Sequence, residues 1–196
     1  MDPKEIPVLV EISARHIHLT AGDIGVLFGK RYQLKRQKKL SQGQDFAAKE
    51  TVDIEVNEQE IKGVRVVGPA RPKTQLELTY SDSYRLKMDL PVRISGDIAG
   101  TPGFKIIGPA GSAIKKEGII IAKRHIHVAP EDAQKHNLKP GDEASLICGD
   151  IRQTTFNKLV IRVQPGFKFT AHIDVDEANA CGIKTRGLGK MSLSSL

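Results

Sequence analysis

Short stretches in which apolar and polar residues alternate run through most of the chain, and this is the pattern of half-buried strands. Thr51–Val56 and Gln75–Tyr80 alternate cleanly, and Gly118–Ala122 is a short apolar run. Further strands are predicted over residues 8–14, 64–67, 91–94, 105–107, 144–147, 159–163 and 168–175. Glycine and proline residues separate these stretches and mark turns. Many short strands joined by turns predict a mainly β fold of the barrel or sandwich type.

Helices are predicted in three places, and all of them are short. Thr20 and Asp23 have the spacing of a capping box before an apolar run. Pro130 stands at a first helical position with acidic residues in the first turn. Residues 176–180, followed by Gly182, have the composition of one or two capped turns.

An internal repeat divides the chain, because residues 14–23 resemble residues 123–132. In both copies a predicted strand leads into Arg-His-Ile-His, followed by an apolar residue and a helix start with Asp at the same offset. A second similarity pairs Val66–Ala70 with Ile106–Ala110. Repeats at this spacing indicate two related units rather than a solenoid. We therefore expect two similar β-barrels that share one interface.

Composition places the chain among soluble globular proteins, since 39% of its residues are hydrophobic and 27% are charged. Cys148 and Cys181 do not suggest a disulfide framework, which favours a reducing cytoplasm. No apolar stretch is long enough for a membrane helix, and the N-terminus lacks the hydrophobic core of a signal peptide. We expect an intracellular protein with no membrane partner.

The net charge of +7 favours polyanionic partners such as nucleic acid, anionic membrane or phosphorylated small molecules. The chain has no Trp and few other aromatic residues, so a stacking platform for single-stranded nucleic acid is hard to build. A solvated loop is the ordinary interpretation of a short basic run. The basic cluster consists of Lys30, Arg31, Lys35, Arg36, Lys38 and Lys39.

The repeated tetrapeptide carries two pairs of histidines, His16 with His18 and His125 with His127. Residues i and i+2 of a strand point to the same face, so each pair is able to chelate one metal ion. A single His-x-His is more often incidental, but two copies at equivalent places favour zinc. The alternative is a structural corner kept in both halves.

Spacing alone leaves the remaining ligands open. His172 and Glu77 have the pattern of solvent-facing strand residues, and Arg71 is either an exposed loop charge or a guanidinium aimed at an oxyanion. No nucleophile elbow or phosphate-binding P-loop is present. If the chain is an enzyme, metal ions are expected to supply the electrostatic stabilisation.

These residues resemble the PduL-type phosphotransacylases, also called phosphate propanoyltransferases. The similarity covers about residues 6–183 in order, and its distinctive segments are residues 13–19, 67–71, 74–77, 91–97, 124–127 and 172–180. The resemblance implies an acyltransferase that interconverts acyl-CoA and phosphate with acyl phosphate and CoA. It also implies two β-barrels capped by short helices, with the N-terminal strand completing the C-terminal barrel.

Residue by residue, the resemblance implies two zinc ions between the barrels. The implied ligands are His16, His18 and Glu77 for one ion and His125, His127 and His172 for the other. Arg71 would bind phosphate, and Ser13, Lys38, Arg65 and Asn179 would contact CoA. The expected domains are residues 1–15 with 123–192, and residues 16–122. Residues 188–196 are expected to form a loose tail.

The resemblance also suggests propanediol degradation and bacterial microcompartments as settings. Many relatives that work inside microcompartments carry an N-terminal amphipathic extension, whereas only about five residues precede the first strand here. A free cytoplasmic enzyme and a chain whose extension was removed both stay open. We expect a homo-oligomer such as a dimer. The alternatives are a zinc-dependent thioester or phosphoester hydrolase on the same scaffold, and a basic β-barrel that binds nucleic acid.

Overall fold

The computed structural model describes residues 5–41 and 43–193, and the strands among them gather in two separate sets. Unit 1 contains residues 5–14, 41, 43 and 123–193, and unit 2 contains residues 15–40 and 44–122. Each unit has its own hydrophobic core. The prediction of a mainly β chain with two barrel-like domains and short helices is confirmed.

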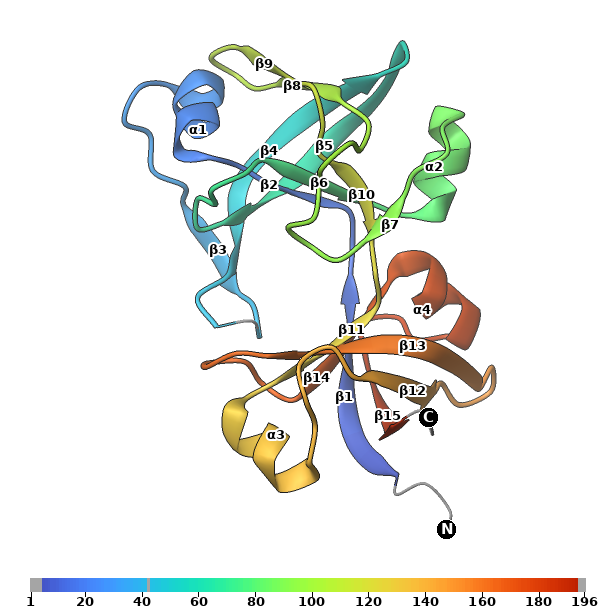
Figure 1. Cartoon of the computed structure of the whole chain (residues 1–196). Helices are drawn as coiled ribbons and strands as arrows, with labels where there is room; N and C mark the ends of the chain where they lie inside the picture. The colour runs from blue at the N-terminus through green and yellow to red at the C-terminus, as the bar shows by residue number, and fades with distance from the viewer. Residues whose placement is uncertain (1–4, 42, 194–196) are drawn as a thin grey trace. The chain divides into compact units, whose positions relative to one another are not determined.

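Unit 1 is a closed barrel in the strand order β1-β14-β11-β13-β12-β15. Its elements are β1 (Ile6–Ser13), β11 (His125–Val128), α3 (Pro130–His136), β12 (Glu143–Cys148), β13 (Thr154–Val163), β14 (Thr170–Asp174), α4 (Val175–Cys181) and β15 (Arg186–Leu193). The blue strand β1 lies among strands coloured orange and red in Figure 1. It pairs in parallel with β14 and antiparallel with β15. The N-terminal strand therefore completes the C-terminal barrel, as expected.

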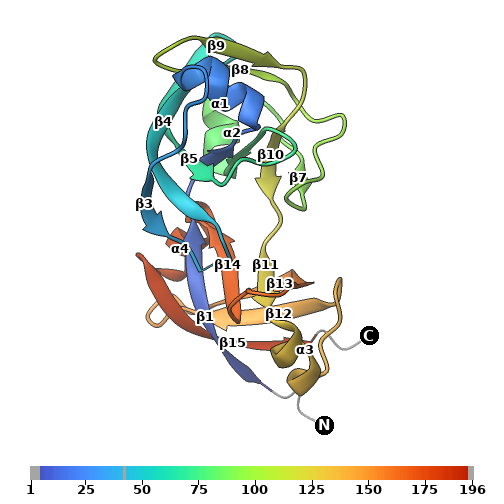
Figure 2. The same ribbon diagram turned by 90° about the vertical axis from the view of Figure 1, so that its left-hand side faces the viewer.

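Unit 2 is a curled sheet in the order β7-β10-β6-β2-β5-β4-β8-β9, with β3 paired to β4. Its strands are β2 (His16–His18), β3 (Arg36–Lys39), β4 (Phe46–Val56), β5 (Gln59–Gly68), β6 (Gln75–Leu78), β7 (Val92–Arg93), β8 (Phe104–Ile107), β9 (Ser112–Lys115) and β10 (Ile119–Ala122). Its helices are α1 (Ala21–Phe28) and α2 (Tyr80–Leu86). Register shifts interrupt the β4–β5 ladder, and β4 bends along its length in Figure 2.

The two copies of the internal repeat have the same pattern of strand pairing. The three-residue strand β2 pairs in parallel with β5 and antiparallel with β6. The corresponding strand β11 pairs in parallel with β13 and antiparallel with β14. In both units the antiparallel partner strand, β6 or β14, leads directly into a short helix, α2 or α4. The same supersecondary unit therefore surrounds each Arg-His-Ile-His segment.

The second sequence similarity has a different origin, because both of its copies lie in unit 2. They stand at the ends of β5 and β8, which both pair antiparallel with β4. A Cβ atom added at Gly68 would lie 2.6 Å from the Phe46 ring, and one at Gly108 would lie 2.5 Å from the Leu27 carbonyl oxygen. At each strand end, the absence of a Cβ atom lets a neighbouring group pack closely against the glycine. The similarity thus reflects the same close packing at two strand ends and not the duplication.

Two predictions about chain segments are wrong. The strand predicted over Gln75–Tyr80 ends at Leu78, because Thr79 and Asp82 form a capping box that starts α2. Residues 188–193, expected in a loose tail, belong to β15, which pairs with β1 and β12. Gly187 and Gly189 let β15 approach Ile183 and Leu146 closely, and Met191 is fully buried. Residues 194–196 lie outside the described part of the chain.

The two cysteines lie in the core of unit 1 with free thiols. Burial, reinforced by the neighbouring Cys181, raises the pKa of the Cys148 thiol to about 12. A thiol at such a pKa carries almost no reactive thiolate at neutral pH.

We expect neither thiol of the native protein to react with Ellman's reagent at pH 8, and both to react after unfolding in guanidinium chloride. Rapid reaction of the native protein would contradict the burial of this pair.

In the described residues, no helix is long and apolar enough to cross a membrane.

Candidate metal centres

The first group of candidate ligands consists of His16, His18 and Glu77 in unit 2. His16 lies directly opposite Glu77 in the antiparallel β2–β6 ladder, and this register places the carboxylate beside the two imidazoles. His16 and His18 share one face of β2, while Ile17 between them is fully buried in the core. One potential ligand atom from each of the three residues lies within 4.8 Å of the others.

The distances within this group suit a zinc ion. The Nε2 atoms of His16 and His18 are 3.1 Å apart. Glu77 Oε2 lies 3.6 Å from His16 Nε2, and Glu77 Oε1 lies 3.8 Å from His18 Nε2. Tetrahedral zinc with metal–nitrogen bonds of ~2.0 Å holds two ligand nitrogens about 3.3 Å apart. Two imidazoles and one carboxylate are also the donor set of several catalytic zinc sites, which keep a position open for substrate.

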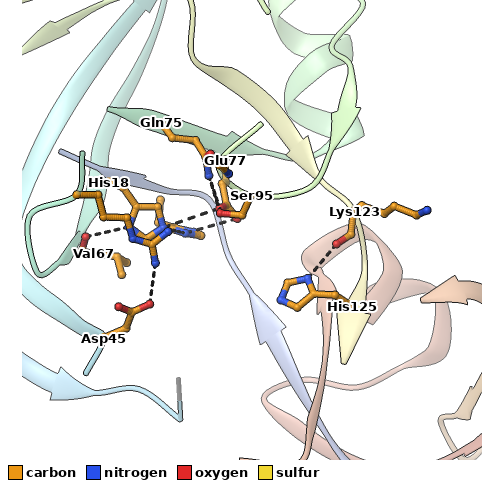
Figure 3. Close-up of polar contacts among 11 residues, drawn as sticks. His18, Asp45, Val67, Gln75, Glu77, Ser95, Lys123 and His125 are labelled. Atoms are coloured by element: carbon orange, nitrogen blue, oxygen red, sulfur yellow. Dashed lines mark hydrogen bonds and ion pairs between the residues drawn. The ribbon is translucent and has the colours of Figure 1, made fainter. Parts of the chain in front are cut away.

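Neighbouring groups fix the direction of these ligands. The Nδ1 atom of His18 lies 3.1 Å from the Val67 carbonyl oxygen, which only accepts hydrogen bonds, so Nδ1 carries the proton and Nε2 is left for a metal. Gln75 Nε2 and Ser95 Oγ both donate to Glu77 Oε1, at 2.7 and 2.9 Å. The Gly96 amide in turn donates to Gln75 Oε1. Figure 3 shows Gln75 and Ser95 converging on Glu77.

Burial keeps His18 in the form that a metal requires. Desolvation, followed by the nearby His16 and Arg71, lowers the pKa of His18 to about 3. The imidazole is therefore neutral across the physiological range, and neutral imidazole is the metal-binding form.

The lowered pKa of His18 predicts an acid-labile fold in the metal-free protein. Below pH 6.5 the unfolded chain protonates this histidine while the folded chain does not, so the free energy of unfolding falls as the pH falls towards 3. The slope is on the order of 1 kcal/mol per pH unit. Urea unfolding of chelator-treated protein at pH 7 and pH 5 should show a larger loss for the wild type than for H18Q. Equal losses in the two proteins would contradict the assignment.

The second group consists of His125, His127 and His172 in unit 1. His125 lies opposite His172 in the antiparallel β11–β14 ladder, as His16 lies opposite Glu77 in unit 2. The ring centroids are 4.6 Å apart for His125 and His127, 5.2 Å for His125 and His172, and 4.6 Å for His127 and His172. Three imidazoles form a donor set that zinc enzymes use.

The second group also has an oriented ligand and a shielded setting. His125 Nδ1 lies 2.9 Å from the Lys123 carbonyl oxygen, visible in Figure 3, which leaves its Nε2 atom for a metal. His127 stacks on Phe167 with ring centroids 3.9 Å apart. The donor chemistry of both groups thus fits zinc.

Glu77 and His172 occupy the same position in the two repeats, and both are buried, with 8% and 4% of their surface exposed. Their interpretation as solvent-facing strand residues is therefore wrong. All four residues of β6 are buried, so Glu77 and the apolar residues beside it are covered on both faces of the sheet. Alternation reports which residues share a face but not whether the second face is also covered.

Arg71 is held in place by its backbone and its side chain. Its amide donates to the Leu19 carbonyl oxygen at 2.8 Å, and its Nη2 atom donates to Asp45 Oδ2 at 2.7 Å. The positive charge of Arg71 is one of the causes that lower the pKa of His18, so the guanidinium influences the first group of candidate ligands electrostatically. The sequence pattern does not single out Asp45, Gln75 or Ser95. Only Gln75 carried a signal, since it lies two residues from Glu77 on the same strand face.

The four residues expected to contact CoA divide between the units. Ser13 ends β1, where it pairs with Asp174, and Asn179 is an exposed residue of α4. Lys38 is exposed on β3. Arg65 on β5 donates from Nη1 to the carbonyl oxygens of residues 48 and 49. Within either unit, the described contacts do not join these side chains into one group.

Comparison with known proteins supplies the family. The phosphate propanoyltransferase family model matches residues 9–184. A phosphate propanoyltransferase of Thermotoga maritima is 46% identical over 187 residues, covering 94% of this chain and 89% of its own. Those of Lachnoclostridium phytofermentans and Listeria monocytogenes are 45% and 41% identical, covering 90% and 92% of this chain and 83% and 84% of their own. The chain belongs to the phosphate propanoyltransferase family and is an acyltransferase.

Proposed function

We propose that this acyltransferase is zinc-dependent and interconverts a short-chain acyl-CoA and phosphate with acyl phosphate and CoA, the acyl group being propanoyl or acetyl. The observation that carries the proposal is that a histidine pair and a potential ligand on the opposite strand occupy equivalent places in both repeats. We assign one zinc ion to His16, His18 and Glu77, and another to His125, His127 and His172. Bound zinc would supply Lewis-acid stabilisation of the charge that develops on a thioester during acyl transfer.

The chain's own residues have defined roles in this proposal. Arg71, fixed by Asp45, offers a guanidinium that is able to bind two oxygens of a phosphate ion. A phosphate oxygen then forms a bond to the acyl carbon while the carbon–sulfur bond breaks, and CoA leaves as a thiolate. The exposed basic residues of β3, including Lys38, together with Ser13, Arg65 and Asn179, are proposed to bind CoA, whose phosphates are anionic.

Direct attack by phosphate is favoured over a covalent acyl-enzyme. Both cysteines are buried, and burial raises the pKa of Cys148 to about 12, which makes it a poor nucleophile. Exchange of labelled CoA into acyl-CoA in the absence of phosphate would contradict direct attack. Such exchange requires an acyl group stored on the protein.

The test combines elemental analysis of the purified protein with an assay of thioester loss at varied phosphate. We expect two zinc ions per chain and a rate of acetyl- or propanoyl-CoA consumption that rises from zero with phosphate and yields acyl phosphate. Release of free acid without phosphate would establish the hydrolase instead. Less than one zinc per chain without activity would overturn the proposal.

Comparison of kcat/KM for acetyl-CoA and propanoyl-CoA identifies the preferred acyl group. Acetyl and propanoyl differ by one methylene, which a hydrophobic pocket distinguishes by about 1–3 kcal/mol. We expect both substrates to be used, with a preference of roughly 10- to 200-fold at most.

A further inference from the structure

The arginine that precedes each histidine pair makes the same kind of contact in both units. In unit 1, Arg124 Nε lies 2.7 Å from Glu177 Oε1, and in unit 2, Arg15 Nη1 lies 3.1 Å from Asp82 Oδ1. Glu177 and Asp82 are the third residues of the helices α4 and α2. Both acids are largely buried, with 18% and 3% of their side chains exposed.

Each of these acids also completes a capping box, which ties it to the strand that bears a candidate ligand. In unit 1 the other oxygen of Glu177 accepts a hydrogen bond from the Asp174 amide at 3.0 Å. Asp174 ends β14 and follows His172 by two residues. In unit 2 the other oxygen of Asp82 accepts from the Thr79 amide at 3.3 Å, and Thr79 follows Glu77 by two residues.

These contacts connect the two strands that carry each ligand pair, through the arginine just before one strand and the capped amide at the end of the other. Arg124 directly precedes His125, which lies opposite His172, and Arg15 directly precedes His16, which lies opposite Glu77. We call the arginine, the acid and the capped amide the clasp of each unit: Arg124–Glu177–Asp174 in unit 1 and Arg15–Asp82–Thr79 in unit 2. The arginine of each clasp is the residue directly before the ladder pair His16–Glu77 or His125–His172, at which the antiparallel ladder of β2 or β11 ends.

The position of the clasps matters because the ligand strands are short. The strand β2 has three residues and β11 has four, so few ladder hydrogen bonds hold His16 or His125 against the opposite strand. A metal site needs its ligands held within ~0.5 Å of the productive geometry. In unit 1 the clasp is reinforced, since Arg124 also lies over the Phe156 ring at 5.3 Å and contacts the carbonyl oxygen of Asn157 on β13.

We propose that Arg15 and Arg124 are positioning residues, each of which holds the ligand pair of its own unit in register for metal binding. The inference rests on the proposed function, because it assumes that both ligand groups bind zinc. The arginines act through the capping acid and the strand that carries Glu77 or His172.

The proposal predicts that each arginine affects only one metal site, which is measurable in variants that keep one site each. H18A leaves the unit 1 site, and H125A leaves the unit 2 site. In the H18A protein, R124Q is expected to weaken zinc binding about 10- to 100-fold, whereas R15Q leaves it unchanged. In the H125A protein the effects are reversed. Affinity is measured by competition with a chromophoric chelator.

Matched controls separate positioning from general destabilisation. R85Q and R152Q remove exposed arginines outside the clasps of units 2 and 1 and should leave both affinities unchanged. R124K should recover part of the affinity lost in R124Q, because an ammonium still donates to Glu177. A general loss of stability would not produce the crossed pattern.

The outcomes are distinct for the two proposals. A wild-type protein with less than one zinc ion per chain and no activity would overturn the proposed function together with this inference. A wild type with two zinc ions, whose R15Q and R124Q variants weaken both sites equally or neither site, would overturn the positioning role alone.

Discussion

Replacement of His125 by alanine is expected to lower the zinc content from two ions per chain to one and to reduce kcat by at least a thousandfold. His125 has its Nδ1 atom on the Lys123 carbonyl oxygen and its ring stacked beside His172, so its loss removes one ligand and disturbs another. Removal of one preorganised electrostatic group from an active site already costs about 10²–10³ in kcat. Zinc analysis and steady-state kinetics measure the two effects.

H136A is the control for this prediction. His136 ends α3, stacks on Phe169 and belongs to neither ligand group. We expect H136A to keep two zinc ions and a kcat within about twofold of the wild type, since substitutions away from such sites change stability and function little. An active H125A protein with one zinc ion would show that the unit 1 metal is not needed for turnover.

Replacement of Arg71 by alanine is expected to raise the KM for phosphate and to lower kcat/KM for phosphate roughly 10- to 100-fold, while zinc content stays at two. A hydrogen bond between charged groups contributes about 1.5–3 kcal/mol, which sets this range. R71K should recover little, because an ammonium cannot form the paired contact of a guanidinium. Kinetics at varied phosphate and saturating acyl-CoA make the measurement.

K73A is the matched control, because Lys73 is an exposed cation two residues further along the chain. We expect its kcat/KM for phosphate to stay within about threefold of the wild type, as exposed charges contribute little. If K73A and R71A lowered kcat/KM equally, the effect would come from general electrostatic attraction and not from a phosphate site at Arg71.

The sequence predicted the two-unit organisation because its repeat includes the strand, the turn and the helix start around each histidine pair. It also predicted that His16 and His18 share a strand face, since this depends only on the two-residue period. The resemblance to a known family supplied Glu77 and His172. Periodicity alone assigned both to solvent, because it cannot reveal whether the polar face of a strand is also buried.

Other features depend on contacts distant in sequence and were not predictable from local pattern. The alternation hides the helix α2, because Tyr80 continues the pattern of β6 and only the Thr79–Asp82 pair marks the start of the helix. The strand β15 contains two glycines and several polar residues, and it is ordered by its pairing with β1 and β12. The clasps could be identified only from the structure, since nothing in the repeat indicates that Arg15 and Arg124 contact helix-capping acids.

The strand order of unit 1 has a consequence for the way the chain acquires its structure during synthesis. β1 is synthesised before the other described strands, whereas its partners β14 and β15 are synthesised after them, so the pairs of Leu9 with Thr170 and Leu188 form late. Unit 2 is built almost entirely from the residues in between and is complete much earlier. Closing a long loop has an entropic cost that slows non-local pairing. We therefore expect the unit 2 ligand group to be in place while the barrel around His125 and His172 is still open, so that β15 closes the fold.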